Sequence, residues 1–148
     1  MLRFGGVSVE GDTAFSANGK TPPWATTTIS PSDFDRLGRL ARRTGWRVLL
    51  SAPLLHYDPR AAAREAAAAA LRLGPMLAAV EIGNEPNGFA VAGGRPASWA
   101  YADYREEISA YRRALDSAAP GVPIAGPDTG MKASTGCRPS RETSGRGS

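Results

Sequence analysis

A chain of 148 residues, 42% of them hydrophobic, is long enough for one globular domain and too apolar for a fully disordered protein. The net charge of +4 does not indicate nucleic-acid binding. Residues 131–148 hold four basic residues against one acidic residue, which leaves a charge of +1 on residues 1–130. No basic stripe with interleaved aromatic residues occurs in residues 1–130. A single cysteine, Cys137, and a single histidine, His56, exclude an internal disulfide bond and predict neither a metal site nor a cofactor.

The start of the chain does not have the pattern of a secretory signal peptide, because residues 1–4 run directly into Gly5-Gly6 instead of a long apolar segment. No stretch is long enough to span a membrane. We therefore expect a cytoplasmic protein without a membrane partner, or a secreted one if the true N-terminus precedes this sequence.

Residues 2–9 are predicted to form the first strand, in which Gly5-Gly6 marks a point where the backbone comes close to another group. A polar connection is expected over residues 11–29. Ser30-Pro31 then provides a helix cap with proline in the first turn, and Gly45 ends this helix.

Residues 46–52 form the second predicted strand, centred on an apolar run. Asp58-Pro59 caps a helix that runs to about Leu73 and stops at Gly74-Pro75. Eight of the ten residues from 61 to 70 are alanine, which favours a helix but defines its buried face weakly.

Residues 77–82 are predicted to form a strand buried on both faces, followed by Gly83-Asn84-Glu85-Pro86. Pro86 cannot continue a strand, so Glu85 is expected at the carboxyl end, where parallel α/β folds place catalytic groups. The alternative is an exposed carboxylate in an ordinary turn.

Residues 86–97 are expected to form a loop, and Ser98 to cap the longest helix. Apolar and aromatic residues at three- and four-residue steps predict its buried stripe, which comprises Tyr101, Tyr104, Ile108, Tyr111 and Leu115. Residues 122–125 form a fourth strand. The alternation of four strands with three helices predicts an α/β domain with a parallel sheet over residues 1–130, and residues 131–148 are predicted to be a disordered basic tail.

Three sequence blocks, at residues 2–6, 81–87 and 126–130, resemble in order and spacing those of glycoside hydrolase family 79, the heparanase and β-glucuronidase-like enzymes. The resemblance covers residues 2–130. It implies a partial (β/α)8 TIM barrel holding barrel strands two to five, and a substrate that is a uronic-acid-containing glycoside.

The resemblance also implies roles for five residues. Glu85 would match the catalytic general acid/base, and Asn84 the amide that hydrogen-bonds the sugar 2-hydroxyl. Glu10 and Asp128 would lie where the substrate binds, and Glu81 would orient neighbouring side chains.

In this family the nucleophile is a glutamate on barrel strand seven, which has no counterpart in this sequence. We therefore expect a truncated, inactive glycosidase-like chain whose open sheet edges could self-associate. One alternative is a non-catalytic carbohydrate-binding or assembly module, in which Asn84, Glu85 and aromatic residues such as Trp24 or Phe89 hold a sugar. Another is an unrelated small α/β domain.

Overall fold

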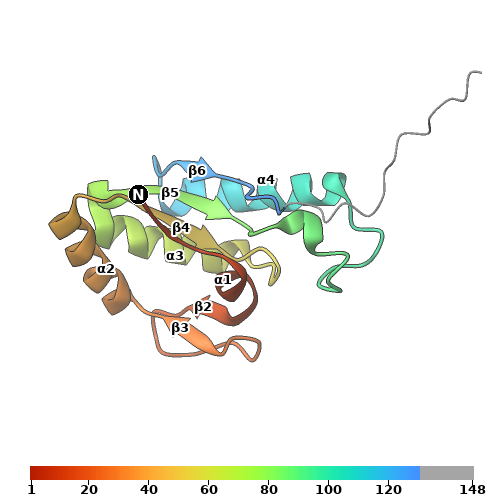
Figure 1. Ribbon diagram of the computed structural model, residues 1–148, viewed down its shortest axis with the longest axis horizontal. Coiled ribbons are helices and arrows are strands. Elements are labelled where there is room, and N and C mark those ends of the chain that lie inside the picture. Colours follow the sequence, from red (N-terminus) through yellow and green to blue (C-terminus); the bar gives the residue numbers. More distant parts are fainter. Residues whose placement is uncertain (131–148) are drawn as a thin grey trace, which may run out of the picture.

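The computed structural model describes residues 1–130. The predicted disordered tail at residues 131–148, together with Cys137, lies outside the described residues. Within them, four parallel strands form one sheet in the order β1-β4-β5-β6 (Figure 1). Their bounds are Leu2–Phe4 for β1, Val48–Ala52 for β4, Leu77–Ile82 for β5 and Ile124–Ala125 for β6.

Three long helices connect successive strands of this sheet: α2 (Pro31–Thr44), α3 (Pro59–Leu73) and α4 (Tyr101–Ala118). Figure 1 shows them beside the sheet, with α3 in contact with both α2 and α4. The predicted α/β class, with parallel strands and crossover helices as in part of a TIM barrel, is confirmed.

Local signals in the sequence explain where α2 and α3 begin. At α2 the Asp33 carboxylate accepts hydrogen bonds from the backbone N–H and the hydroxyl of Ser30, and Gly45 ends the helix in the left-handed conformation. At α3 the Asp58 side chain accepts from the N–H of Ala61. Both predicted helices are confirmed, and the weak alanine face is buried between sheet and neighbouring helices.

The prediction for residues 2–9 is wrong beyond Phe4. The chain turns at Gly6, whose φ is 96°, and forms a short helix, α1 (Val7–Asp12). The predicted connection over residues 11–29 also holds a small parallel sheet of β2 (Thr13–Phe15) and β3 (Thr27–Ile29). The alternation of apolar residues continues past Gly6 to Val9, so it predicted one unbroken strand. The turn at Gly6 needs a positive φ, which glycine adopts readily.

The start of α4 also differs from the prediction. Ala100, not Ser98, is the N-cap, and its N–H donates to the Asp103 carboxylate. Tyr111 and Leu115 are buried as expected, whereas Tyr101, the first residue of the helix, is 73% exposed. A short 3-10 turn, η2 (Pro86–Gly88), occupies part of the predicted loop.

The two faces of the main sheet differ in character. The face toward the helices is apolar, and its buried members include Val48, Leu50, Val80 and Ile82. On alternate positions, pointing to the other face, β4 carries Ser51 opposite Glu81 of β5. This second face provides the polar groups of the candidate site.

Helix α4 fixes the loop between β4 and α3 through Tyr111. The fully buried Tyr111 hydroxyl donates to the Pro53 carbonyl (2.9 Å) and accepts from the N–H of Asp58 (3.1 Å). Burial raises the pKa of this phenol, so the hydroxyl stays protonated as a donor.

The edges of the main sheet within residues 1–130 are β1 and β6. Self-association through these edges stays a prediction.

None of the helices in the described residues combines the length and apolar character needed to cross a membrane.

We predict that Tyr111→Phe lowers the free energy of unfolding by about 1–3 kcal/mol, because it leaves the Pro53 carbonyl and the Asp58 N–H without a partner. Tyr101→Phe, on the same helix but exposed, is the matched control and should change stability by less than about 0.5 kcal/mol. Urea denaturation of both variants checks this. An equal effect of the two substitutions would contradict the proposed anchoring by Tyr111.

Candidate active site at the carboxyl ends of the strands

Asn84 and Glu85 follow the end of β5, next to Asp128 at the end of β6. Asn84 forms a parallel bridge with Asp128, and the Glu85 N–H donates to the Asp128 carbonyl at 2.8 Å. Glu85 has φ 51° and ψ 47°, a left-handed conformation that costs a non-glycine residue about 1–2 kcal/mol. Strained backbone of this kind is concentrated at functional sites. The exposed Glu85 side chain is thus held at the strand ends.

The blocks at residues 83–87 and 126–130 meet at Gly130. A β-carbon at Gly130 would lie 2.7 Å from the carboxyl carbon of Glu85, so the carboxyl group packs against bare backbone. The Asn87 side chain donates to the Gly130 carbonyl and accepts from its N–H, both at 3.1 Å. These contacts hold the two blocks together.

Arg3 of β1 connects the ends of β5 and β6. Its Nε donates to Glu81 at 2.9 Å, and its second terminal nitrogen contacts both the Asn84 side-chain oxygen at 3.0 Å and the Asp128 carboxylate at 2.9 Å. The contact fixes the orientation of the Asn84 amide, since the oxygen faces Arg3. The Asn84 NH2 group is left as a donor.

Glu81 lies behind this contact with its side chain 7% exposed. It accepts a 2.6 Å hydrogen bond from the Ser51 hydroxyl as well as the bond from Arg3. Gly5 lies against this pair, because a β-carbon at Gly5 would overlap the Ser51 hydroxyl oxygen. The predicted close approach at Gly5 is confirmed.

Glu10 of α1 is 4% exposed and accepts hydrogen bonds only from backbone groups. One oxygen accepts from the N–H groups of Leu54 and Leu55, and the other accepts from the N–H of Asn84 at 2.8 Å. Burial raises the pKa of the Glu10 carboxyl, against these donors and His56, which lower it. Glu10 therefore joins α1 to two strand ends, and the predicted sugar contact stays a prediction.

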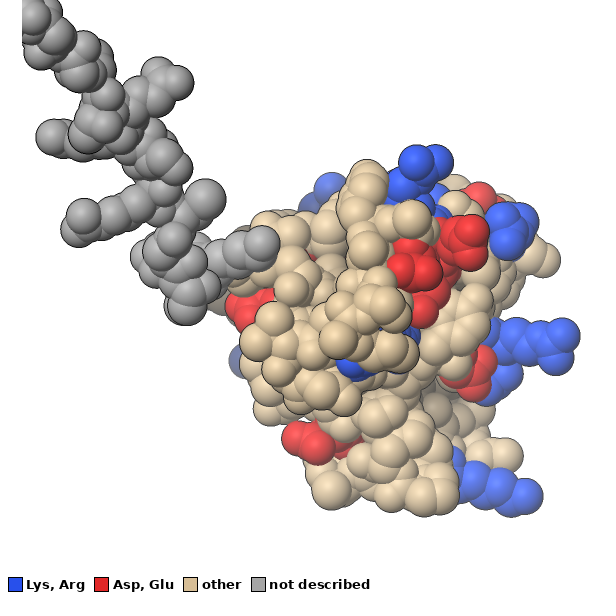
Figure 2. Space-filling view, turned by 90° about the vertical axis from the view of Figure 1, so that its right-hand side faces the viewer, with Lys and Arg blue, Asp and Glu red and all other residues tan. Residues whose placement is uncertain are grey.

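A cavity of about 220 Å³ adjoins these residues. Glu10, Asn84 and Glu85 line it together with the apolar Leu55 and Phe89. Trp24, the other aromatic residue considered from the sequence, lines a different cavity and stacks on His56. Figure 2 shows this end of the molecule, where acidic side chains lie at separate places on a mostly uncharged surface. The cavity therefore offers amide and carboxyl groups for hydrogen bonds beside apolar side chains.

All five predicted residues are thus connected, and four of them lie around Arg3: Glu81, Asn84, Asp128 and the backbone of Glu85. Glu10 reaches the same region through the N–H of Asn84. Sequence reasoning missed the roles of Arg3 and Ser51, although an arginine in a short, otherwise apolar strand was a usable signal for Arg3. In residues 1–130 no group of three or more His, Cys, Asp or Glu side chains is placed to hold a metal ion.

No protein-family model and no curated protein sequence matches the chain. Among solved structures it is similar to a 4-O-α-L-rhamnosyl-β-D-glucuronidase from Fusarium oxysporum 12S, in a complex with Rha-GlcA, with a TM-score of 0.65 and 23% sequence identity. The match covers 88% of this chain, which spans 30% of the length of that structure. The chain therefore has the fold of part of a glycoside hydrolase.

We predict that Arg3→Met lowers the free energy of unfolding by about 2 kcal/mol. Removing the partner of a buried carboxylate costs about 3–5 kcal/mol, and the 35% exposure of the Arg3 side chain reduces this cost. Arg36→Met, which removes a solvent-exposed pair with Asp33, is the matched control and should cost under about 0.5 kcal/mol.

Denaturant titration measures both variants. The double variant Arg3→Met/Glu81→Gln should lose less than the sum of the single losses, because the two residues share one interaction. Additive losses would show that Arg3 does not stabilise the fold through Glu81.

Proposed function

We propose that this chain supplies the acid/base side of the active site of a retaining glycoside hydrolase of family 79. In this proposal Glu85 is the general acid/base, and the Asn84 amide donates to the sugar 2-hydroxyl. The single observation that carries the proposal is that Asn84 and Glu85 line one cavity at the carboxyl ends of parallel strands, in the fold of a glucuronidase.

The contacts around Asn84 suit this role. A hydrogen bond to the sugar 2-hydroxyl contributes most as the ring approaches an oxocarbenium-like transition state, provided that the donor is held in place. Arg3 binds the Asn84 oxygen, and Glu10 binds the Asn84 N–H. We infer that Arg3, Asp128 and Glu81 serve to hold this amide, which gives Asp128 an indirect part in substrate binding.

A retaining mechanism also needs a second carboxylate about 5–5.5 Å from the acid/base. The other carboxylates near Glu85 in residues 1–130 are already bound: Glu81 and Asp128 by Arg3, and Glu10 by backbone N–H groups. We therefore propose that the chain is inactive alone, and that the nucleophile comes from a strand not represented in residues 1–130.

The proposed substrate is a uronic-acid-containing glycoside. This choice rests on the sequence blocks shared with family 79 and on the similarity of the fold to that of a β-D-glucuronidase. It names the class of sugar and leaves the aglycone open.

We predict no turnover of an aryl β-glucuronide by the purified chain. Release of the aryl group, followed by absorbance, checks this against Glu85→Gln. Turnover that Glu85→Gln abolishes would contradict the proposed inactivity and support Glu85 as acid/base. Turnover that survives in Glu85→Gln would contradict the assignment of Glu85.

A non-catalytic carbohydrate-binding role is the second candidate, favoured by the absence of a free second carboxylate near Glu85 in the described residues. It predicts that uronic-acid oligosaccharides bind at millimolar concentration in a calorimetric titration. Asn84→Ala should weaken this binding about tenfold, because one buried hydrogen bond to the ligand is lost. Asn18→Ala, in the loop between β2 and β3, is the control. Absence of heat would exclude this role.

A further inference from the structure

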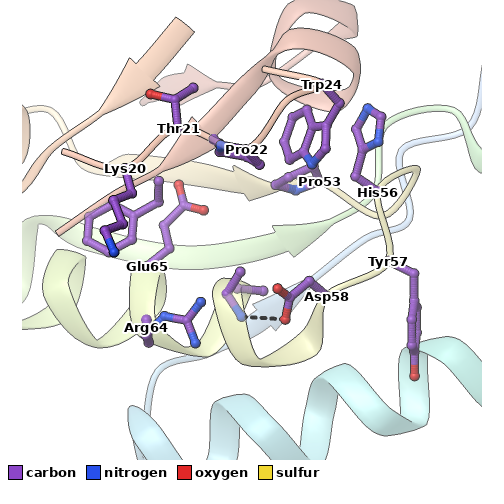
Figure 3. A pocket seen from close by; sticks show the side chains of 14 residues that line it. Lys20, Thr21, Pro22, Trp24, Pro53, His56, Tyr57, Asp58, Arg64 and Glu65 are labelled. Atoms are coloured by element: carbon purple, nitrogen blue, oxygen red, sulfur yellow. Dashed lines mark hydrogen bonds between the residues drawn. The ribbon is translucent and has the colours of Figure 1, made fainter. Parts of the chain in front are cut away.

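A second cavity, of about 600 Å³, lies between α3, the loop from β2 to β3, and the loop from β4 to α3 (Figure 3). It shares no lining residue with the candidate active site. Its walls combine apolar residues, which include Phe15, Pro22, Trp24 and Pro53, with polar and charged ones. The volume is within the range of cavities that hold small organic ligands.

Glu65 of α3 is the buried polar residue of this cavity. It is 4% exposed, and no hydrogen bond or ion pair joins its carboxyl group to any of residues 1–130. Figure 3 shows the side chain extending from α3 into the cavity, toward Pro22 and Trp24. The Glu65 oxygens are not among the fully enclosed polar atoms without a partner, so they remain accessible from the cavity. A mostly buried carboxyl group that no protein group binds is a candidate for pairing with a ligand.

The charged and titratable groups around Glu65 do not supply that partner. Asp58 accepts from the N–H of Ala61, and the His56 ring contacts the Gly11 carbonyl while it stacks on Trp24. Lys20 and Arg64 also line the cavity, and in Figure 3 Arg64 extends toward Asp58 and away from the Glu65 carboxyl. Within residues 1–130, Glu65 is thus a hydrogen-bonding group without a protein partner, in a cavity lined by both apolar and polar side chains.

We propose that this cavity binds a small organic cation, whose ammonium or guanidinium group pairs with the Glu65 carboxylate and whose apolar part lies against Trp24, Pro22 and Phe15. An ionised carboxylate only accepts hydrogen bonds, and a cationic group only donates them, so the two are complementary. An anionic ligand could enter only while Glu65 stays protonated, and would depend on Lys20 and Arg64 for charge pairing.

Binding of a cation changes the protonation of Glu65. Burial raises the pKa of this carboxyl from its ordinary value of 4.5 to about 8, so the empty cavity holds the neutral acid at pH 7. When the cation enters, the carboxyl oxygen–hydrogen bond breaks, and its proton goes to solvent. Affinity should therefore rise with pH until the free protein is itself ionised.

Benzylamine, a cation at pH 7, is a suitable probe for calorimetric titration of the full chain. We expect binding with release of close to one proton, measured from the dependence of the heat on the ionisation enthalpy of the buffer. Benzyl alcohol, which has the same ring without the charge, should bind at least about tenfold more weakly. Equal binding of the alcohol, or no binding of benzylamine at millimolar concentration, would overturn the proposal.

Glu65→Gln keeps the shape of the side chain and removes its charge. It should weaken benzylamine binding about ten- to a hundredfold and abolish proton release, whereas Glu106→Gln, exposed on α4, should change neither. Lys20→Met should retain binding. Unchanged binding in Glu65→Gln would contradict the assignment.

The stability of the empty protein tests the same carboxyl group without a ligand. Because the pKa is raised in the folded state, the folded protein holds a proton between pH 4.5 and 8 that the unfolded chain has lost. The stabilising effect is complete below pH 4.5 and is lost as the pH rises to 8. The melting temperature of the wild type should fall across this range relative to Glu65→Gln. A constant difference would show that Glu65 already has a partner, and the proposal would fail.

Discussion

The candidate active site depends on the hydrogen bonds and ion pairs of the Arg3 guanidinium group. The guanidinium lies on the polar face of the sheet and contacts three groups that come from the last part of β5 and the end of β6. Parallel strands have no hairpin turns to align their ends, so the relative position of such ends must come from the ladder or from side chains. Here β6 has only two residues. Beyond it, the backbone bridge between Asn84 and Asp128, and the contacts of the Arg3 side chain with both residues, hold the strand ends together.

The loop from β4 to α3 is the second constraint, because it forms part of both cavities. Glu10 binds its N–H groups, and Arg95 binds the carbonyls of Leu54 and Leu55 at 2.8 and 2.7 Å. Tyr111 holds its two ends. Three side chains thus hold this loop: one from α1, one from the segment before α4 and one from α4 itself. The loop can therefore form a wall of two separate cavities.

How much of this was predictable from the sequence depended on the range of the interactions. The limits of α2 and α3 followed from Ser30, Asp58 and Gly45, which act within one turn of the helix. The position of Glu85 followed from the strand and from Pro86. The contacts of Arg3 with Glu81 and Asn84 span 78 and 81 residues, and those of Glu10 span 44 to 74, so no local pattern could reveal them. The burial of Glu65 was equally hidden. The cavity around this side chain forms only where β2 and the loop after it lie against α3.

The contact between Gly130 and Glu85 has a consequence for how the Glu85 carboxyl group is positioned. The carboxyl group occupies the space that a side chain at residue 130 would need. Its location therefore requires that residue 130 has no β-carbon. Even alanine at residue 130 would displace the carboxyl group from this position. The position of the Glu85 carboxyl group therefore depends on residue 130, forty-five residues downstream, which has no functional group of its own.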